Sequence, residues 1–212
     1  MEQARELYQR MRTAPQGFQL ETLLAEMKVE LDVQSADLER IPVKGPLVAV
    51  ANHPFGVLDG AALGVLMSRV RPDVKILTDP VLEGIPGLHE RCIFVDSCPI
   101  ASSTDKNLKP LKQAIEWLRS GGALTVFPAG EVSQWNLLEA QTTDPAWDTL
   151  AARLVRRTGA SALPVYFGGC NSVTFQLARF GPPASPDALS AAGVTAAARE
   201  GRADSHRQSD FI

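Results

Sequence analysis

Short apolar runs alternate with longer amphipathic stretches through the middle of the chain, after Gly45-Pro46. Apolar runs of this kind are typical of buried strands, and they occur at 47–51, 74–77, 92–95, 123–127 and 162–167. Stretches with helical spacing lie between them, at 60–70, 105–119 and 146–158. Strands that alternate with helices favour a largely parallel sheet covered on both faces. We therefore predict a single α/β domain with a core at 41–178, flanked by helices.

Two of the predicted helices have clear end signals. Helix 105–119 stops before Gly121-Gly122, where glycine favours a helix end. Helix 146–158 follows Asp144-Pro145, a capping residue followed by proline in the first turn, and stops at Gly159. These signals predict that Asp144 caps the helix.

The first 40 residues precede this pattern and are predicted to form N-terminal helices. Apolar residues recur at helical spacing between Leu20 and Leu31. We favour a helical hairpin whose apolar stripe covers the core over a helix that lies on a membrane surface. The polar face of this stretch is acidic, which disfavours attraction to anionic lipid.

The last segment, 179–212, has a different composition. It holds eight alanines and three prolines but only five large apolar or aromatic residues. Such a segment has little to bury, so we expect a low-complexity tail that is disordered or loosely attached. An out-of-frame or truncated end would also give this composition.

Composition narrows the possible functions. A chain of 212 residues is long enough to bury a sizeable core. The net charge is −3 and there is no basic tail, so no nucleic-acid partner is indicated. Cys92, Cys98 and Cys170 form no CxxC pair, which indicates neither zinc nor disulfides and favours a reduced, intracellular setting. No apolar run approaches the roughly 18 residues of a spanning helix.

Polar residues follow three of the predicted strands. His53 follows 47–51, Asp96 follows 92–95, and 128–133 follows 123–127. The carboxyl ends of parallel strands share one edge of a sheet, where open α/β folds bind ligands. Of the three histidines, only His53 leaves a strand into a Pro/Gly loop with a carboxylate, Asp59, six residues later. This arrangement is typical of a general base and its orienting acid.

Other chemistries lack their motifs. The sequence contains no GxSxG elbow, which weakens an α/β-hydrolase interpretation. It contains neither GxGxxG nor GxxxxGK[ST], so dinucleotide and P-loop interpretations lose support. Neither HExxH nor paired Cys/His spacing suggests a metal.

Four blocks in order carry a family resemblance. Residues 52–59 resemble NHxxxxD, 94–97 resemble F-[IV]-D-R, 127–133 resemble FPEGTRS, and 162–166 resemble a strand carrying V-P. These are the blocks of the glycerolipid acyltransferase superfamily, which contains 1-acylglycerol-3-phosphate acyltransferase. The patterns NHPxGxxDG and FPAGEVS resemble its hemolysin-like branch, which is similar to acyltransferases proposed to acylate lyso-aminolipids.

The resemblance implies a role for each block. His53 would act as the general base on an acceptor hydroxyl, and Asp59 would fix its tautomer and stabilise the imidazolium. The candidate acceptor-binding residues are Asp96, Ser97, Gly130, Glu131 and Ser133. The candidates for the loop that supplies oxyanion donors are Asn52, Pro54 and Gly56.

The resemblance also implies partners and a location. The acyl donor would be acyl-CoA or acyl carrier protein, with no bound cofactor or metal. The acceptor would be a lysolipid, reached from the membrane surface. We expect a cytoplasmic protein associated peripherally with the inner membrane.

Several positions depart from the family pattern. The His–Asp spacing is one residue longer than usual, within a Pro/Gly loop that can absorb an insertion. Ser97 and Val132 stand where the family has arginines associated with the acceptor's phosphate, and Ala129 replaces its glutamate. Arginine binds phosphate through a planar, bidentate fork that serine and valine lack. We therefore expect a lyso-aminolipid acceptor.

Three alternatives remain open at this point. The protein could acylate lysophosphatidate, with Lys106 or Arg91 binding the phosphate. It could bind lipid or acyl groups without catalysis. Asp59 could simply cap helix 60–70. A His53–Asp59 contact in a deep cleft would favour the enzyme.

Overall fold

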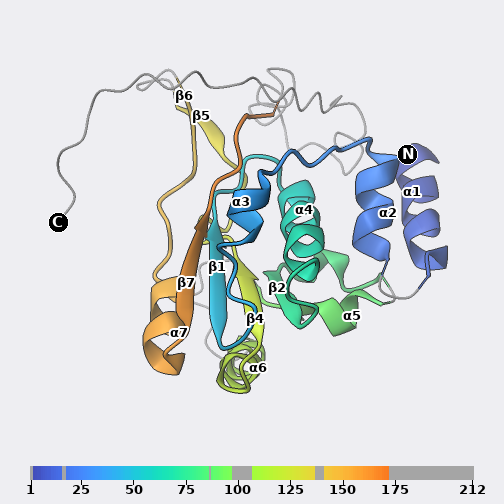
Figure 1. Cartoon of the computed structure of the whole chain (residues 1–212). Coiled ribbons are helices and arrows are strands. Elements are labelled where there is room, and N and C mark those ends of the chain that lie inside the picture. The colour runs from blue at the N-terminus through green and yellow to red at the C-terminus, as the bar shows by residue number, and fades with distance from the viewer. Residues whose placement is uncertain (1, 16–17, 86, 97–106, 137–140, 172–212) are drawn as a thin grey trace.

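A parallel sheet of five strands forms the centre of the molecule in the computed structural model, which describes residues 2–15, 18–85, 87–96, 107–136 and 141–171 (Figure 1). The strands are β1 (Leu47–Ala51), β2 (Val74–Thr78), β3 (Cys92–Phe94), β4 (Ala123–Val126) and β7 (Ser161–Val165). Their order is β3-β2-β4-β1-β7, and every neighbouring pair is parallel. The predicted α/β class is confirmed, and each predicted strand is present within two residues of its expected ends.

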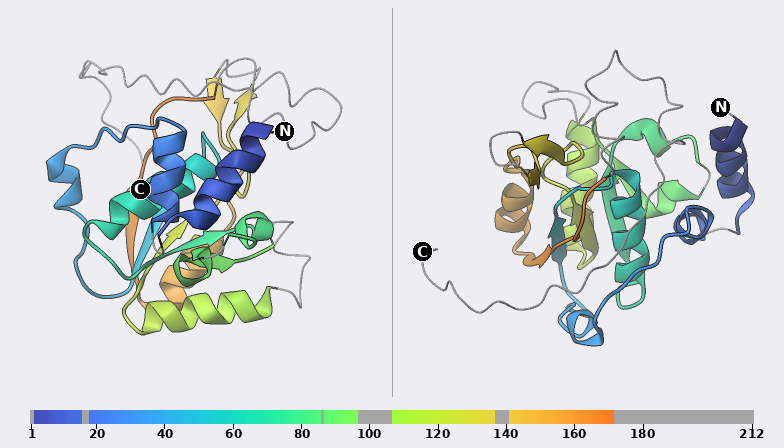
Figure 2. Two further views of the ribbon diagram at one scale, coloured as in Figure 1. Left: turned by 90° about the vertical axis from the view of Figure 1, so that its right-hand side faces the viewer. Right: turned by 90° about the horizontal axis from the view of Figure 1, so that it is seen from above.

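Helices cover both faces of this sheet. On one face, α6 (Leu108–Arg119) and α7 (Leu150–Thr158) pack on a cluster that includes Val48, Leu124 and Ile93. On the other face, α4 (Val57–Ser68) packs on a cluster that includes Leu47 and Ala49. Figure 2 shows the helices on the two sides of the strands. Adjacent residues of β1 point to opposite faces, so its apolar run is buried on both sides.

The N-terminal helices cover the α4 side of the core. Helix α1 (Glu2–Thr13) and α2 (Gln19–Glu26) are joined by an ion pair of 2.7 Å between Arg10 and Glu26. Leu20 and Leu23 of α2 are buried, and they belong to the same cluster as Ala61 of α4. The apolar stripe therefore packs on the core, as the hairpin interpretation predicted. A further short helix, α3 (Ser35–Leu38), leads to β1.

The ends of the helices differ from the predictions. Helix α4 begins at Val57, three residues early. Helix α7 begins at Leu150, so the prediction that Asp144 caps it is wrong. The backbone N–H of Leu150 instead bonds to the carboxylate of Asp148 at 2.5 Å. Because the segment before α7 is free of the helix, Asp144 can reach the site described below.

Several small elements were not expected from the sequence. They are the 3₁₀ helix η1 (Pro80–Leu82), the short helix α5 (Leu88–Arg91) and an antiparallel hairpin of β5 (Gln134–Asn136) with β6 (Gln141–Thr143). The strands of the hairpin have three residues each, which is too few to show the alternation of apolar and polar residues that identifies a strand. The predicted tail, 179–212, lies outside the described residues, so its state stays a prediction.

A buried arginine ties the amino ends of three strands together. The guanidinium of Arg71 donates to the backbone carbonyls of Pro42, Gly45 and Gly121 at 2.8–3.0 Å. It also pairs with Asp73 at 2.7 Å, and this hydrogen bond holds the pKa of the Asp73 carboxyl below its ordinary value. These contacts fix the edge of the sheet opposite to the one that carries His53.

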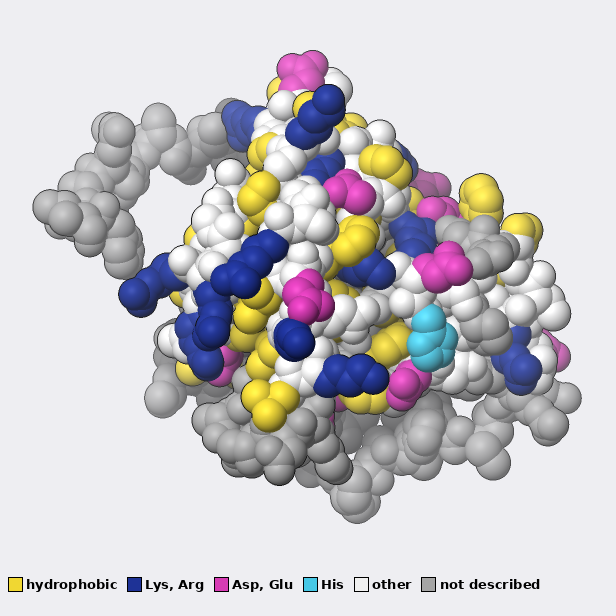
Figure 3. All heavy atoms as spheres, turned by 90° about the horizontal axis from the view of Figure 1, so that it is seen from below, with side chains coloured by type: hydrophobic (Ala, Val, Ile, Leu, Met, Phe, Trp, Pro, Cys, Tyr) yellow, Lys and Arg dark blue, Asp and Glu magenta, His cyan; other side chains and the backbone are white. Residues whose placement is uncertain are grey.

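Charge is unevenly distributed over the surface. Figure 3 views the molecule from below and shows Lys and Arg side chains gathered on that face. The exposed cations of α6 and α7 are Lys109, Lys112, Arg119, Arg153, Arg156 and Arg157. The net charge of −3 therefore coexists with a locally basic surface.

Candidate active site

The site lies where β1 and β4 end side by side. These strands are hydrogen-bonded neighbours, with Val50 paired to Val126. The loop that carries His53 therefore lies beside the loop at 127–133, as the parallel sheet predicted. The rings of His53 and Phe127 are in contact, with centroids 4.4 Å apart. Strand β3 is at the sheet edge, with β2 and β4 between it and β1.

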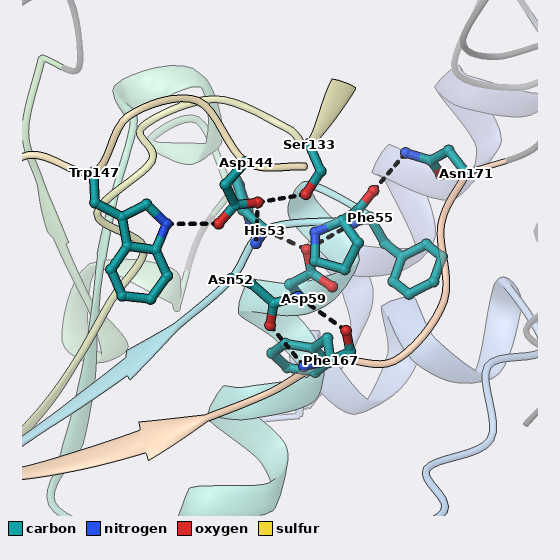
Figure 4. Close-up of polar contacts among 10 residues, drawn as sticks. Asn52, His53, Phe55, Asp59, Ser133, Asp144, Trp147, Phe167 and Asn171 are labelled. Atoms are coloured by element: carbon teal, nitrogen blue, oxygen red, sulfur yellow. Dashed lines mark hydrogen bonds and ion pairs between the residues drawn. The ribbon is translucent and has the colours of Figure 1, made fainter. Parts of the chain in front are cut away.

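The central contact joins His53 to Asp59. His53 Nδ1 lies 3.1 Å from Asp59 Oδ2 (Figure 4), and Nδ1 has no other hydrogen-bonding partner among the described residues. The Asp59 side chain is 1% exposed, whereas that of His53 is 17% exposed. The carboxylate is thus held behind the imidazole, away from solvent. This geometry leaves Nε2 as the nitrogen available to a substrate.

The start of α4 turns Asp59 toward His53. Gly56 adopts φ +68 and ψ −126 before the first helical residue, a conformation that favours glycine. Asp59, in the first turn, accepts a hydrogen bond from the backbone N–H of Phe55 at 2.8 Å. Phe55 lies one residue before the N-cap Gly56, so this bond fastens the loop to the first turn of α4, and Asp59 is not itself the N-cap that the sequence left open. Asp59 therefore serves both the helix start and His53, and the longer His–Asp spacing does not separate the pair.

Burial dominates the ionisation of Asp59. It raises the pKa of the Asp59 carboxyl above the ordinary value of 3.8, and the hydrogen bonds from His53 and Phe55 lower it in part. The second oxygen, Oδ1, is buried with no hydrogen-bonding partner in the described part of the chain. A positive charge on His53 would offset this cost, because it would pair with the buried carboxylate.

Asp144 contributes a second carboxylate that the sequence did not point to. Its Oδ1 accepts hydrogen bonds from the backbone N–H of His53 at 3.2 Å and from the hydroxyl of Ser133. Its Oδ2 accepts from Trp147 Nε1 at 2.8 Å (Figure 4). The Asp-Pro pair at 144–145 indicated a helix cap, and that signal obscured this position. Asp144 and His53 are 91 positions apart in the sequence, so no local pattern relates them.

Two of the oxyanion-loop candidates have structural partners instead. Both ends of the Asn52 side-chain amide bond to the backbone of Phe167, at 2.7 and 2.9 Å. Pro54 has no backbone N–H to donate, and its carbonyl accepts from Asn171 at 2.7 Å. These contacts fasten the His53 loop to the chain after β7. Gly56 is the candidate of the three that lines the cavity described next.

A cavity of about 470 Å³ opens beside His53. Its volume is in the range of roughly 300–1,000 Å³ that small-molecule sites occupy. Near His53 its wall includes Gly56, Phe127, Gly130 and Glu131. Much of the remaining wall is apolar, with contributions from α2, α4, β2 and α5; these include Leu20, Leu23, Ala61, Ile76 and Leu88. The cavity thus joins a base to an apolar interior.

The acceptor-binding candidates do not all reach this cavity. Gly130 and Glu131 line it. Ser133 is 3% exposed, and its hydroxyl is bonded to Asp144. The backbone of Asp96 bonds on both sides to the Asn107 side chain, at 2.8 and 2.9 Å, and Asp96 is not part of the cavity wall. Ser97 lies outside the described residues.

No group of three or more His, Cys, Asp or Glu side chains within the described ranges could hold a metal ion. Among the helices of those ranges, none is long and apolar enough to cross a bilayer.

The α/β sheet thus carries a His–Asp pair at its carboxyl edge beside a largely apolar cavity, an arrangement suited to a general base that acts on an apolar substrate. A family model described as Acyltransferase matches residues 32–168. Because this match covers more than half of the chain, the chain belongs to the acyltransferase family. The family resemblance of the four blocks is confirmed.

Two curated relatives are similar to this chain. The chain is 29% identical over 149 residues to a lyso-glycine lipid O-acyltransferase of Bacteroides thetaiotaomicron. It is 27% identical over 148 residues to a protein of the same name from Phocaeicola vulgatus. Each alignment covers 69% of this chain, but 52% and 50% of the relatives. The chain therefore spans about half the length of the curated relatives that it matches.

Proposed function

We propose that this protein is an O-acyltransferase that moves a fatty acyl group from a thioester to a hydroxyl of a lysolipid, and that the acceptor is a lyso-aminolipid. The observation that carries the proposal is the 3.1 Å contact of His53 Nδ1 with the buried carboxylate of Asp59, beside a largely apolar cavity. The family match and the names of the two relatives support the same reaction class.

The reaction follows from the two side chains. Nε2 of His53 takes the proton of the acceptor hydroxyl as its oxygen attacks the thioester carbonyl. The C–S bond then breaks, and the departing thiolate receives the proton from the imidazolium. Asp59 keeps the imidazole in the tautomer with a proton on Nδ1 and stabilises the cation that forms between these steps. The products are an ester and a free thiol, so no covalent enzyme intermediate is needed.

The charge of the cavity wall supports an acceptor without a phosphate monoester. Among the described residues of the wall none is Lys or Arg, and Asp79, Glu131 and Asp148 are acidic. Val132 stands at a family arginine position, and its Cγ2 would lie 3.0 Å from a Cβ at Gly56. It therefore packs on the loop and offers no phosphate ligand.

Lysophosphatidate acylation is less well supported. Arg91 was a candidate phosphate ligand, but its side chain is 15% exposed and bonds to Ser68 at 2.5 Å and to Glu21 at 3.4 Å. It is not part of the cavity wall. Lys106, the other candidate, lies outside the described residues.

The acyl donor and the contact with a membrane are also part of this proposal. We propose acyl-CoA or acyl carrier protein as donor and peripheral contact with a membrane surface for access to the lysolipid. Sedimentation with anionic and neutral vesicles at low and high salt tests the contact. Binding to neither vesicle at low salt would contradict it.

The test of the function is acyl transfer itself. The full-length chain is incubated with labelled acyl-CoA or acyl carrier protein and a panel of lyso-lipids, and the products are identified by mass spectrometry. His53→Ala should lower the rate by about 10²–10⁴-fold, because it removes the general base. His89→Ala is the matched control, since His89 lies on α5, packs against Phe94 and is not part of the cavity wall. A folded His53→Ala protein with wild-type turnover would exclude His53 as the base. Absence of transfer by the wild-type protein with every donor and acceptor would instead favour lipid binding without catalysis.

A further inference from the structure

Asp144 holds the backbone of the proposed base without belonging to the His53–Asp59 pair. Strand β1 ends at Ala51, so the ladder of the sheet does not extend to His53. The backbone there is bonded by other groups. His53 N–H donates to Asp144 at 3.2 Å, and His53 C=O accepts from the backbone N–H of Ser133 at 2.9 Å.

We propose that Asp144 is a positioning residue for acyl transfer, which sets the His53 backbone in register with the loop at 128–133. The inference rests on the proposed role of His53 as general base. Asp144 reaches neither the imidazole contact to Asp59 nor the cavity wall. Its effect on the reaction therefore passes through His53 and Ser133.

The first argument is that three groups close a ring. Ser133 donates its backbone N–H to His53 and its hydroxyl to Asp144, while Asp144 accepts from His53. Each member is bonded to the other two, so none can shift alone. Gly130 and Glu131, three and two residues before Ser133, line the cavity. The ring therefore relates the base to the loop that faces the substrate.

The second argument is that Asp144 also anchors another part of the cavity wall. Trp147 Nε1 donates to Asp144 Oδ2, and the backbone N–H of Asp148 donates to the carbonyl of Pro128 at 2.9 Å. Ala146 and Asp148 of this segment line the cavity. The Trp147 bond stays within the segment before α7, whereas the bonds of Asp144 with Ser133 and of Asp148 with Pro128 hold this segment against the loop at 128–133.

The chemistry of the donors requires a carboxylate at this position. Asp144 receives three donors and gives none, which suits an ionised carboxylate, an acceptor on both oxygens. An amide retains one acceptor oxygen for His53 and Ser133 but turns an N–H toward the indole N–H of Trp147. Asp144→Asn should therefore lose the Trp147 contact and retain the ring.

The experiment compares steady-state acyl transfer by Asp144→Ala, Asp144→Asn and the double variant Asp144→Asn/Trp147→Phe. Asp144→Ala should lower kcat by about 10–100-fold, since a misplacement near 1 Å can cost about 100-fold. KM should change much less, because no group of the cavity wall is removed. Asp144→Asn should recover most of kcat. The double variant should recover more, because Trp147→Phe removes the indole N–H that faces the amide N–H of the Asp144→Asn side chain.

A control separates positioning from general destabilisation. Asp73→Ala removes a carboxylate that also accepts two hydrogen bonds, from Arg71, at the opposite edge of the sheet. It should lower the unfolding temperature while kcat per folded molecule stays near wild type. If Asp144→Ala does not fold, Ser133→Ala opens the same ring and should lower kcat in the same way. Wild-type kcat in folded Asp144→Ala, or in folded Ser133→Ala in its place, would overturn the inference.

A second readout does not depend on activity. Hydrogen exchange of the His53 backbone amide, measured by NMR, should be faster in Asp144→Ala than in the wild type, and the ring ¹⁵N signals of His53 should change. Unchanged exchange and ring signals would overturn the inference even if kcat falls. If the wild-type protein shows no transfer with any donor, the proposed function fails, while this measurement still decides whether Asp144 positions His53.

Discussion

At the scale of single residues, two effects act in opposite directions on the ionisation of Asp59. Its burial disfavours the ionised form, and its contacts with His53 and Phe55 favour it. The ionised carboxylate therefore costs stability but supports the imidazolium during transfer. Function and stability should respond oppositely to its removal, which is common where a polar group is retained for catalysis.

Asp59→Asn should lower kcat by about 10²–10⁴-fold, because an amide can donate to Nδ1 and stabilise the wrong tautomer. The free energy of unfolding at pH 7 should be equal to or above that of the wild type. A raised folded-state pKa gives stability that is complete below the unfolded value, near 3.8, and is lost as the pH rises through the folded value. The stability difference between variant and wild type should therefore grow with pH over this window. Denaturant unfolding between pH 3 and 7 measures it, and a variant that loses stability at pH 7 contradicts it.

Val132→Arg should move acceptor preference toward lysophosphatidate. Val132 lies beside the Gly56 loop, and a guanidinium there would offer the bidentate phosphate contact that the described cavity wall lacks. The wild type should prefer the lyso-aminolipid in competition, and the variant should narrow or reverse this preference. Val132→Leu serves as the uncharged control. A wild-type preference for lysophosphatidate would refute the charge argument and indicate a cation outside the described residues.

At the scale of elements, the contact of α2 with α4 is built around a small residue. A Cβ at Gly64 of α4 would lie 2.6 Å from Ile76 of β2 and 2.9 Å from Leu20 of α2. Leu20 and Ile76 also line the cavity. Gly64 is eight residues from Gly56, which is about 12 Å along a helix, so this contact lies away from the Gly56 loop. The close packing at Gly64 therefore sets how α2 closes the apolar part of the cavity.

Gly64→Val should lower the free energy of unfolding by about 1–3 kcal/mol, as overpacking of a filled core does. The same helix offers a matched control in Gly60, where a Cβ would meet its nearest atoms at 4.0 Å. Gly60→Ala should leave stability unchanged or raise it by about 0.5–1 kcal/mol, because alanine restricts the unfolded chain. Chemical denaturation compares the two. Equal changes in the free energy of unfolding from both substitutions would show that α2 moves to accommodate the larger side chain at Gly64.

At the scale of the whole molecule, the three apolar clusters are composed of described residues from Leu7 to Phe167. Residues 179–212 lie outside the described part, and their composition offers little to bury. The expectation that they are not integral to the core rests on that composition alone.

Deleting the chain after Ala178 should therefore shift the unfolding temperature by less than about 2–4 °C, the change that 1 kcal/mol produces in a domain of this size. Differential scanning calorimetry of the full chain and the truncated chain measures the shift. A truncated chain that is unfolded, or that melts far lower, would assign the tail to the core.

The sequence determined the features that depend on neighbouring residues. The apolar runs identified the strands of the sheet, and a spacing of six residues identified His53 with Asp59. Short-range periodicity carries such information because side-chain direction repeats within a strand or helix. End signals were less reliable, since Asp144-Pro145 resembled a helix start while the helix begins at Leu150.

Only the tertiary structure decided which distant residues meet. The strand order brings the β1 and β4 loops together and leaves β3 at the edge, so Asp96 is separate from His53. The Asp144 carboxylate bonds a backbone 91 residues away, and α2 and β2 share a cavity with His53. Such meetings depend on how elements pack, and no local pattern encodes them. The proposed base, His53, could therefore be predicted from the sequence. The groups that hold its backbone and the apolar cavity beside it could not.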